Sequence, residues 1–320
     1  MNIIILGAAG FIGINLTLAL AKEKDEKGKC RNNITLFDRE IADFSHVRKS
    51  GFSDISIIRG NFDIDSDFEA LTKDQDIVYH LISTTVPTTS NQQIAKEITS
   101  NVVVTANFLE ACVKNKVKKV VFLSSGGTVY GKEKNMPLKE DMATYPISSY
   151  GLQKITIEKL LYLYRYMHGI DYRVIRLANP YGPYQRPNGV LGVVTTFVYK
   201  VLMGEPITVY GDGSIVRDFI YINDAIKGIL NIVSGESKHR TFNLGCGKGH
   251  SIKEVIDIIH EALSIDVNVE YVSGRKVDVP INVLNINLYE ETYGKLEYIS
   301  LAEGVKKTAT FMREFYGTKL

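Results

Sequence analysis

The N-terminal stretch constrains the fold of this chain more than any other segment. An apolar run, MNIIIL, leads into Gly7, Gly10 and Gly13, and a helix-like run, INLTLALAKEK, follows. Glycines at this spacing let the backbone turn tightly after a strand and approach a pyrophosphate at the N-terminus of a helix. The third glycine also lets the helix pack closely on the strand. The order of strand, glycines and helix therefore predicts the first unit of a dinucleotide-binding fold.

The next strand-like run, ITLFD, ends at Asp38. An acidic side chain at this place can hold the two hydroxyls of an adenosine ribose and repel a 2′-phosphate. We therefore predict NAD rather than NADP, although the neighbouring Arg39 argues the other way. A signal peptide or membrane span is the alternative for residues 2–21, which carry no charge. It is rejected because no basic segment precedes the run and three glycines suit a spanning helix poorly.

The composition is that of an ordinary globular enzyme. The chain has 320 residues, 45% of them hydrophobic, and a formal net charge of +2, so we expect no nucleic acid or membrane partner. Cys30, Cys112 and Cys246 have no metal or redox spacing, which indicates a reducing, cytoplasmic compartment. The six histidines show no paired-ligand spacing, so no metal site is predicted. His80, inside the apolar run DIVYHL, is interpreted as a packed, hydrogen-bonded core residue.

Strand-like runs alternate with helical runs along the first half of the chain. We expect strands near 2–6, 34–38, 55–59, 76–81, 119–124 and 172–177, and helices near 11–24, 41–49, 64–73, 92–115 and 148–168. This alternation predicts an α/β fold of the Rossmann type, with a doubly wound parallel sheet. A later helix and strand, near 222–234 and 241–244, are expected to extend the same sheet.

The chain is expected to form two domains, each assembled from two segments. Residues 1–178 with 222–248 would form the dinucleotide-binding Rossmann domain. Residues 179–221 with 249–320 would form a smaller, mixed α/β domain that binds the substrate. The turn-rich segment NPYGPYQRPNG marks the first boundary.

Tyr150 and Lys154 lie four residues apart in a predicted helix, which places both side chains on one face. A lysine ammonium beside a phenol favours the phenolate, and it should lower the phenol's pKa from about 10 towards working pH. Tyr150 is therefore a candidate general base. The same spacing occurs at Tyr130 and Lys134, where nearby glycine and proline indicate a loop, whereas Tyr150 follows a Ser-Ser cap signal.

Ligands bind beyond the carboxyl ends of the strands in an open parallel sheet. The residues that follow strands here are the glycine loop, Asp38, Asn61, Ser83 to Thr85, Ser124 to Thr128, and Asn179. They are predicted to converge with Tyr150 in one cleft. The run Ser-Ser-Gly-Gly after VVFL indicates close approach of a ligand, whereas Ser83 to Thr85 could equally well only terminate a strand.

Motifs over nearly the whole chain resemble those of the extended short-chain dehydrogenase/reductases, in the branch of nucleotide-sugar epimerases and dehydratases. They are GAAGFIG, VVFLSSGGTVYG, YGLQK, RLANPYGPYQRP, GDGSIVRDFIYIND and GRKVDVPINVL. The resemblance implies NAD in the first domain and a UDP-sugar in the second. It also implies a homodimer formed through the helices near 92–115 and 148–168.

The resemblance also assigns roles to single residues. Catalysis would fall to Tyr150 and Lys154, helped by the hydroxyl of Ser125 or Thr128. The residues expected at NAD are Gly7, Gly10, Phe11, Ile12, Gly13, Asp38, Asn61, Phe62, Leu81, Ser83, Asn101, Ser124, Tyr150 and Lys154. Those expected at the nucleotide sugar are Thr85, Ser125, Tyr150, Asn179, Tyr210, Arg217, Arg275, Asp278 and Asn282. The two arginines would face the diphosphate, although taken alone they would be ordinary surface charges.

Two positions depart from the family pattern. The family usually has Ser or Thr four residues before the tyrosine of VYG, and this chain has Gly126 there. The hydroxyl role must therefore pass to Ser125, to Thr128 or to water. The second departure is Asn61, where an aspartate commonly contacts adenine; its amide oxygen can still accept the hydrogen bond.

The reaction implied by the resemblance is epimerisation at the 4-position. The Asp-Glu pair of the 4,6-dehydratases is replaced here by Gly127 and Thr128, so dehydration is not expected. NAD would take a hydride from the sugar while Tyr150 takes the hydroxyl proton, and the 4-keto sugar would rotate before hydride returns. A nucleotide-sugar 4-ketoreductase and a non-catalytic NAD-binding sensor or scaffold stay open. The Tyr150–Lys154 pair argues against the sensor, and Gly126 argues mildly for it.

Asn282, four residues beyond Asp278, bears on the sugar that is accepted. In the epimerases that this chain resembles, a bulky ring at the matching place restricts the enzyme to plain hexoses. Asparagine is smaller and can donate to an acetamido carbonyl, so we expect both UDP-glucose/UDP-galactose and the N-acetylated pair to react. The alternative is that Asn282 only caps a turn after Pro280.

Overall fold

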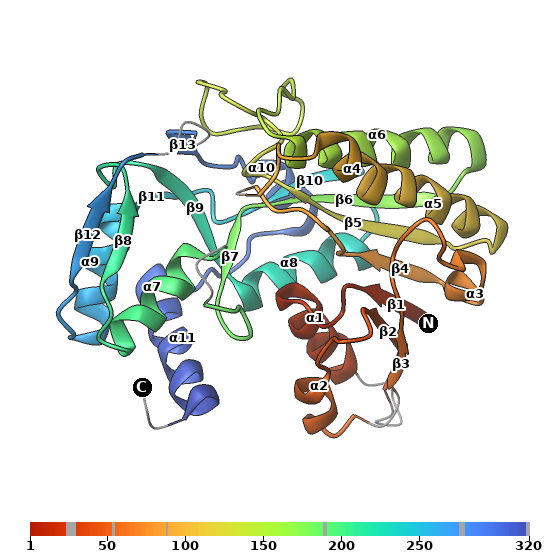
Figure 1. Ribbon diagram of the computed structural model, residues 1–320. Coiled ribbons are helices and arrows are strands. Elements are labelled where there is room, and N and C mark those ends of the chain that lie inside the picture. The colour runs from red at the N-terminus through yellow and green to blue at the C-terminus, as the bar shows by residue number, and fades with distance from the viewer. Residues whose placement is uncertain (24–29, 53–54, 88, 188–190, 275–278, 318–320) are drawn as a thin grey trace. The chain divides into compact units, whose positions relative to one another are not determined.

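A seven-stranded sheet contains the strands predicted from the first half of the sequence (Figure 1). Its strands are β1 (Asn2–Leu6), β2 (Asn33–Asp38), β3 (Ile55–Arg59), β4 (Ile77–His80), β5 (Lys119–Ser125), β6 (Asp171–Leu177) and β10 (Thr241–Leu244). Their order is β3-β2-β1-β4-β5-β6-β10, and the pairs from β1 to β5 are parallel. The strand order reverses between β1 and β4, as in a doubly wound sheet. The predicted Rossmann-type α/β fold is confirmed, including β10 as a late addition to the sheet.

The structure describes residues 1–320 except 24–29, 53–54, 88, 188–190, 275–278 and 318–320. The described chain divides into two compact units. The first unit comprises residues 1–125, 148–175 and 237–241, and the second comprises 126–147, 176–236 and 242–320. These bounds differ from those of the two predicted domains, and the assignment of cofactor and sugar to separate domains stays a prediction.

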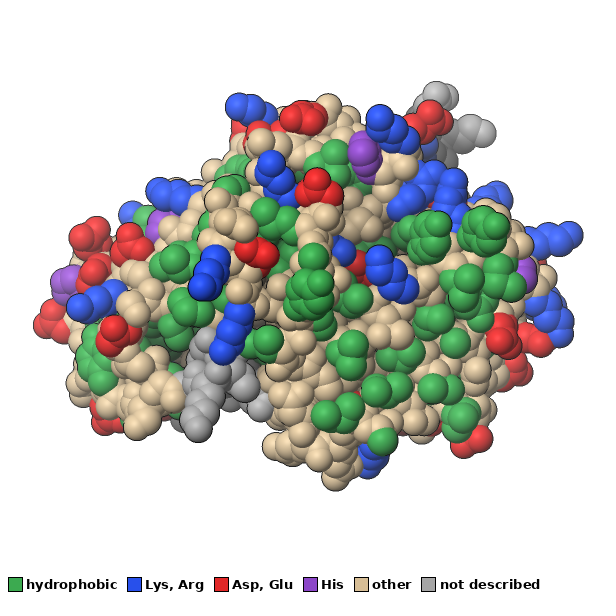
Figure 2. Space-filling model, turned by 90° about the horizontal axis from the view of Figure 1, so that it is seen from above, with side chains coloured by type: hydrophobic (Ala, Val, Ile, Leu, Met, Phe, Trp, Pro, Cys, Tyr) green, Lys and Arg blue, Asp and Glu red, His purple; other side chains and the backbone are tan. Residues whose placement is uncertain are grey.

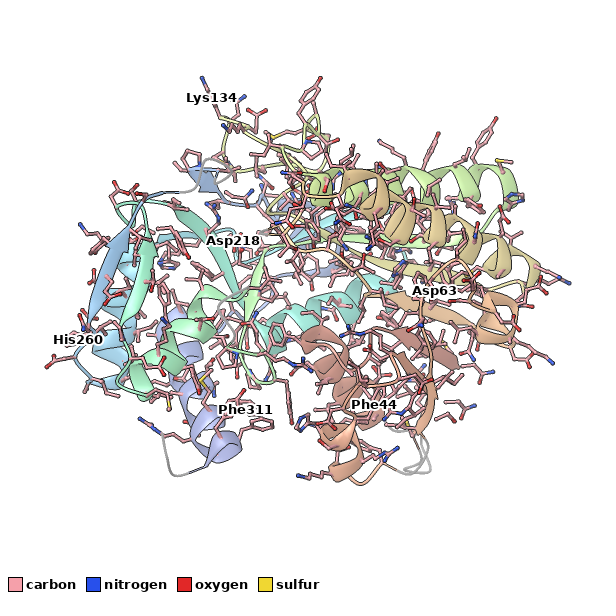
Figure 3. The ribbon with its side chains drawn as sticks, viewed as in Figure 1. Phe44, Asp63, Lys134, Asp218, His260 and Phe311 are labelled. Atoms are coloured by element: carbon pink, nitrogen blue, oxygen red, sulfur yellow. The ribbon has the colours of Figure 1, made fainter. Side chains whose placement is uncertain are left out.

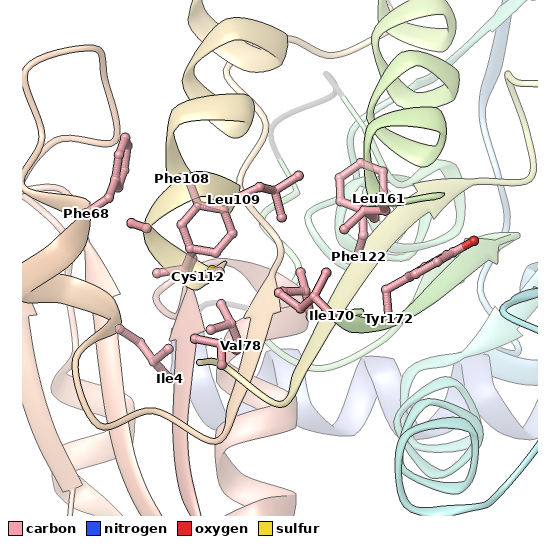
Figure 4. Close-up of a cluster of buried hydrophobic side chains, with 14 of the residues drawn as sticks. Ile4, Phe68, Val78, Phe108, Leu109, Cys112, Phe122, Leu161, Ile170 and Tyr172 are labelled. Carbon is pink, nitrogen blue, oxygen red and sulfur yellow. The ribbon is translucent and has the colours of Figure 1, made fainter. Parts of the chain in front are cut away.

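Helices cover both faces of the sheet in the first unit. They are α1 (Phe11–Lys22), α2 (Ser45–Lys49), α3 (Phe68–Thr72), α4 (Ile94–Ile98), α5 (Val104–Lys114) and α6 (Ser149–His168). In Figure 1, α4, α5 and α6 lie on one face, and α1 and α2 lie on the other. Strand residues two apart share a face, so Ile4, Val120 and Phe122 join Phe108 of α5 and Leu161 of α6 in one apolar layer (Figure 4). This layer holds α5 and α6 against the sheet.

The helical segment predicted near 92–115 is not one regular helix. It contains α4, a π-helical turn η1 (Thr99–Val103), and α5. A π-turn accommodates an extra residue within a helix, and such turns are frequent at functional sites. The prediction of a helix is confirmed, but its interruption was not foreseen.

The second unit contains smaller sheets and five helices within its described residues. Its strands are β7 (Asn179–Tyr181), β8 (Ile207–Tyr210), β9 (Val216–Tyr221), β11 (Gly249–Ser251), β12 (Val269–Val272) and β13 (Ile281–Asn282). Its helices are α7 (Val193–Leu202), α8 (Ile222–Ser234), α9 (Ile252–Leu263), α10 (Asn287–Tyr293) and α11 (Leu301–Tyr316). Strand β9 pairs with β7, β11 and β13, and β8 pairs with β12. Within the described part of the chain, no helix combines the length and the apolar character needed to cross a membrane.

Asp218 of β9 joins distant segments of the second unit (Figure 3). Its buried carboxylate accepts backbone N–H bonds from Cys246 at 2.8 Å, Gly247 at 3.1 Å and Leu284 at 3.4 Å. Burial raises the pKa of Asp218 to about 6, although these hydrogen bonds oppose the rise.

Candidate active site

The glycine loop between β1 and α1 has the geometry that the sequence predicts. Gly7 has φ +86°, a conformation that favours glycine, and its N–H donates to the carbonyl of Phe37 at 2.9 Å. A Cβ atom on Gly13 would lie 2.4 Å from the oxygen of Gly7 and 2.6 Å from the Cα of Ala8. These neighbours are backbone atoms, so only glycine allows α1 to approach β1 this closely.

The N-terminus of α1 and the end of β2 together fit a dinucleotide. Among the described residues, no side chain caps α1 at Gly10, which leaves the N–H groups of its first turn for an anion. Asp38 is fixed beside the loop because its Oδ2 accepts the N–H of Ala9 at 2.9 Å and its Oδ1 accepts that of Arg39 at 2.8 Å. Each carboxylate oxygen keeps a lone pair for a ribose hydroxyl. The geometry of these residues therefore fits NAD.

Helix α6 places Tyr150 and Lys154 on one face, as predicted. The helix is capped by Ser148, whose Oγ accepts the N–H of Gly151 at 3.2 Å. Lys154 Nζ lies 5.5 Å from the ring centroid of Tyr150 and donates to the carbonyl of Leu123 at 2.9 Å. The lysine is therefore anchored to β5 beside the phenol.

The sequence predicts that Lys154 lowers the pKa of the Tyr150 phenol. This prediction is wrong when the protein chain alone is considered. Burial raises the pKa of Tyr150 to about 12, and a hydrogen bond with Ser125 opposes this only in part. Burial also lowers the pKa of Lys154 to about 8, while the Glu158 carboxylate acts in the opposite direction. Both groups are desolvated, and this disfavours their charged forms.

The serines at the end of β5 contact different residues of α6. Ser125 is the hydroxyl bonded to Tyr150, whereas Ser124 Oγ donates to Glu158 Oε1 at 2.5 Å. Thr128, the other candidate hydroxyl, has a buried Oγ1 without a hydrogen-bond partner among the residues that the structure describes. Sequence reasoning missed Glu158, although its position four residues beyond Lys154 was an available signal.

The loop after β4 is bonded to α6 and η1. Ser83 Oγ donates to the carbonyl of Thr85 at 2.9 Å, and Thr85 Oγ1 donates to Gln153 Oε1 at 3.2 Å. The N–H of Thr84 donates to Asn101 Oδ1 at 2.9 Å. The first unit thus joins the predicted residues Ser83, Thr85 and Asn101 in one polar group with α6.

The other residues expected at NAD lie at the ends of β3 and β4. Asn61 is exposed, whereas the ring of Phe62 packs 5.1 Å from that of His80, centroid to centroid. The N–H of Leu81 donates to the carbonyl of Leu6 at 3.0 Å. These residues follow strands as predicted, and their contacts with a cofactor stay a prediction.

His80 is a core residue, which confirms its interpretation from the sequence. It is 3% exposed, and its Nε2 lies 3.1 Å from Thr105 Oγ1. The rings of Phe108 and Phe122 lie 5.7 Å and 5.5 Å away, centroid to centroid. Burial lowers the pKa of His80 to about 3, so the imidazole is neutral at physiological pH.

The predicted sugar-binding residues of the second unit bond mainly to backbone groups. Asn179 Nδ2 donates to the carbonyl of Asp218 at 2.9 Å, and Arg217 Nη1 donates to that of Val279 at 2.6 Å. Tyr210, at the end of β8, is 41% exposed. These contacts hold strands together, and a role at the sugar stays a prediction for each residue.

The second Tyr-x-x-x-Lys pair lies in a loop, as predicted. Tyr130 is buried in the second unit, outside any helix, and its hydroxyl donates to Asn243 Oδ1 at 2.6 Å. Arg176 Nη1 donates to the same hydroxyl at 3.0 Å. Tyr130 therefore joins a packing network and is not paired with Lys134.

Asn282 is 1% exposed and contacts the Gly126 segment. Its Nδ2 donates to the carbonyl of Gly126 at 3.1 Å, so it does not act as a turn cap. Its Oδ1 is buried and has no hydrogen-bond partner in the described part of the chain. Arg275 and Asp278, the remaining predicted sugar contacts, lie outside the described residues.

The packing around Gly126 leaves little room for a side chain at this position. A Cβ atom on Gly126 would lie 2.5 Å from Cδ1 of Leu284 and 3.1 Å from the oxygen of Arg176. The serine or threonine usual in the family would therefore collide with the Leu284 side chain. No local pattern reveals this contact, because Leu284 is distant in sequence.

Comparison with known proteins agrees with this geometry. Residues 3–245 match the NAD dependent epimerase/dehydratase family. A putative UDP-glucose 4-epimerase of Methanocaldococcus jannaschii is 32% identical over 97% of this chain and 98% of its own. An Escherichia coli dTDP-4-dehydro-6-deoxyglucose reductase is 30% identical over 98% of both chains. The structure of a Methanobrevibacter ruminantium UDP-N-acetylglucosamine 4-epimerase, in complex with UDP-N-acetylmuramic acid, has a TM-score of 0.88 at 29% identity and 98% coverage of both chains. The chain therefore belongs to the NAD-dependent epimerase/dehydratase family, whose cofactor is NAD.

Proposed function

We propose that this protein is a UDP-sugar 4-epimerase. The observation that carries the proposal is the half-buried Tyr150, which is bonded to Ser125 and faces Lys154. The same unit contains the glycine loop and Asp38, which fit NAD. A base, a supporting hydroxyl and a cofactor site are the parts that reversible oxidation of a sugar hydroxyl requires.

Each residue of the group has a distinct task in this reaction. Tyr150 takes the proton of the sugar 4-hydroxyl and returns it after the ketone has rotated. Ser125 bonds the phenol, and Lys154 supplies positive charge from its anchored position on Leu123. The glycine loop and Asp38 would hold NAD, which would supply a hydride acceptor and donor and, when oxidised, a positively charged ring. Since burial alone raises the pKa of Tyr150 to about 12, positive charge near the phenol is needed to favour the phenolate.

The proposed substrates are UDP-glucose and UDP-galactose, together with their N-acetylated counterparts. The named activities of the Methanocaldococcus and Methanobrevibacter relatives support both pairs. Asn282 supports the larger pair, because its unpartnered Oδ1 and small size suit an acetamido group. Since Asn282 is 1% exposed, a tyrosine there would also disturb packing, so the decisive comparison uses the parent protein.

The test measures bound cofactor and turnover in the same preparation. Purified protein is denatured to release NAD, and native protein is then given each UDP-sugar without added cofactor. We expect close to one NAD per chain and conversion of each sugar to its 4-epimer. Rejection of both N-acetylated sugars would contradict the substrate proposal, and no epimer from any UDP-sugar would contradict the function.

A 4-ketoreductase is the second candidate, and the Escherichia coli reductase supports it. It would use the same Tyr150 and Lys154 but release oxidised cofactor. Consumption of reduced cofactor in proportion to a 4-keto sugar, without epimerisation, would identify it. Bound NAD without either reaction would identify a sensor.

We also propose a homodimer formed through α6 and the α4–η1–α5 segment. Along α6, large side chains are exposed, with Tyr162 at 59%, Tyr166 at 81% and Met167 at 61%. Figure 2 views the molecule from above. Hydrophobic side chains gather there in the half where Figure 1 places α4, α5 and α6. An exposed patch of this kind is typical of an interface. Light scattering should give twice the mass of the chain, and a monomer at all concentrations would contradict the dimer.

A further inference from the structure

Glu97 is a buried carboxylate in the first unit, 7% exposed, and the catalytic proposal does not use it. It lies in α4, directly before the π-helical turn η1. Acidic side chains are almost never buried unless their oxygens are paired. The partners of Glu97 therefore indicate what it does.

Both oxygens of Glu97 accept hydrogen bonds, and two of the donors belong to α6. Oε2 accepts from Ser149 Oγ and, at 3.3 Å, from Gln153 Nε2. Oε1 accepts the N–H of Gln93 at 3.2 Å. Ser149 directly precedes Tyr150, and Gln153 directly precedes Lys154. One carboxylate thus holds the neighbours of both members of the candidate pair.

The partners of Glu97 are themselves held by the first unit. The N–H of Ser149 donates to Asn91 Oδ1 at 2.6 Å, and the N–H of Asn91 donates to Ser149 Oγ at 3.2 Å. Gln153 Oε1 accepts from Thr85 Oγ1 at 3.2 Å. The first turns of α6 are therefore connected, through buried side chains, to the loop after β4.

A hydrogen bond from the π-helical turn η1 also fixes the helix that carries Glu97. Asn101, within η1, donates from Nδ2 to the carbonyl of Glu97 at 2.9 Å. The hydrogen bond from Ser149 is the main cause that lowers the pKa of Glu97, so the side chain is ionised at neutral pH. Hydrogen bonds to an ionised acceptor are about twice as strong as neutral ones.

We propose that Glu97 is a positioning residue for the reaction: it fixes the first two turns of α6, and thereby the directions of the Tyr150 phenol and the Lys154 ammonium. This inference rests on the proposed function and assigns Glu97 no contact with the reacting atoms. A carboxylate is required because both of its oxygens accept from N–H or O–H donors, whereas the amide of glutamine would present donors to one side.

The first experiment replaces Glu97 by glutamine, which keeps the size of the side chain. We expect Glu97→Gln to lower kcat by about tenfold or more, because small displacements of reacting groups have large effects on rate. KM for the UDP-sugar and the content of bound NAD should stay within about threefold, since Glu97 contacts neither ligand in this proposal. The control is Glu261→Gln, the same change at an exposed residue of α9.

The second experiment asks whether Glu97 acts through Tyr150 and Lys154. In a background that carries both Tyr150→Phe and Lys154→Met, the phenol and the ammonium are absent, so adding Glu97→Gln should change the residual turnover by less than about twofold. If the two effects multiply instead, Glu97 acts elsewhere and the proposal is overturned. Ser149→Ala provides an independent variant, because it keeps the carboxylate and removes one of its α6 donors; it should lower kcat in the same direction by a smaller factor.

The remaining outcomes each decide the question. A kcat equal to that of the parent in Glu97→Gln, or a lower melting temperature with unchanged turnover per folded molecule, would assign Glu97 to stability alone and overturn the proposal. If the parent protein epimerises a UDP-sugar, the proposed function stands and only the inference about Glu97 fails. A parent that contains NAD but epimerises no UDP-sugar overturns the proposed function and this inference with it.

Discussion

The two units use buried carboxylates in different ways. In the first unit, Glu97 accepts hydrogen bonds from side chains of α6 and from backbone N–H groups, and its pKa is lowered. In the second unit, the Asp218 carboxylate accepts backbone N–H bonds from Cys246, Gly247 and Leu284, and burial raises its pKa to about 6. The comparison teaches that hydrogen bonds outweigh desolvation at Glu97, whereas desolvation outweighs hydrogen bonds at the more deeply buried Asp218.

The largest expected effect tests whether the first unit performs the chemistry. Tyr150→Phe should lower turnover by about 10² to 10⁴, the usual contribution of a general base, while NAD stays bound. Steady-state kinetics with NAD quantification of the same sample provides the measurement. A turnover within about threefold of the parent would remove Tyr150 as the base and end the functional contrast between the units.

The second prediction tests the role of Asp218 through pH. Its folded pKa is raised above the unfolded value of about 3.9, so the folded state binds more protons between about pH 4 and 6. The contribution of Asp218 to stability should therefore fall as pH rises through this window, by roughly 2–3 kcal/mol, and level off above it. In Asp218→Asn this fall should be absent, although the variant is less stable overall because an amide cannot replace both acceptor oxygens.

Denaturant unfolding at pH 4, 5, 6 and 7 measures this contribution. Asp257→Asn, at an exposed aspartate of α9, is the matched control and should keep the pH profile of the parent. If Asp218→Asn also keeps the profile, desolvation of Asp218 is not what distinguishes the second unit.

The third prediction concerns packing at Gly126. Gly126→Ser, which restores the usual residue of the family, should lower the free energy of unfolding by about 1–3 kcal/mol because the new Cβ overpacks against Leu284. Combining it with Leu284→Ala should cost less than the sum of the single changes, because the alanine makes room. Additive changes in thermal or denaturant unfolding would show that Leu284 is not the obstacle.

The smallest expected effect separates the two candidate hydroxyls. Ser125→Ala should lower kcat by about tenfold, because it removes the hydrogen bond to the phenol. Thr128→Ala should have less effect, since Thr128 has no hydrogen-bond partner among the described residues. The reverse order of the two kcat values would assign the role of the supporting hydroxyl to Thr128.

Local sequence patterns predicted most of the first unit. Apolar runs bounded by turns correspond to β1 through β6, and the glycine spacing corresponds to the loop before α1. The Tyr150–Lys154 spacing predicted a shared helical face because helix geometry is set by neighbours in the chain. These features depend on residues close in sequence, so the sequence displays them.

The features that sequence reasoning missed depend on contacts between distant residues. A Cβ atom at position 126 would meet the Leu284 side chain, and nothing near Gly126 in the chain indicates this contact. The raised pKa of Tyr150 results from burial, which sums over many surrounding atoms. Glu97 lies in a helix whose π-turn changes the direction of every side chain before it, so regular helical spacing could not place it inside.

The π-turn also makes the site sensitive to how the extra residue of the helix is accommodated. A regular α-helix turns by about 100° per residue, so if Thr99–Val103 became regular α-helix with no residue removed, α4 would rotate by about this angle relative to α5. Glu97 would then turn away from Ser149, although no residue of the α6 group had been substituted. A change within Thr99–Val103 that removes the π-turn while keeping every residue would therefore disconnect the carboxylate from α6.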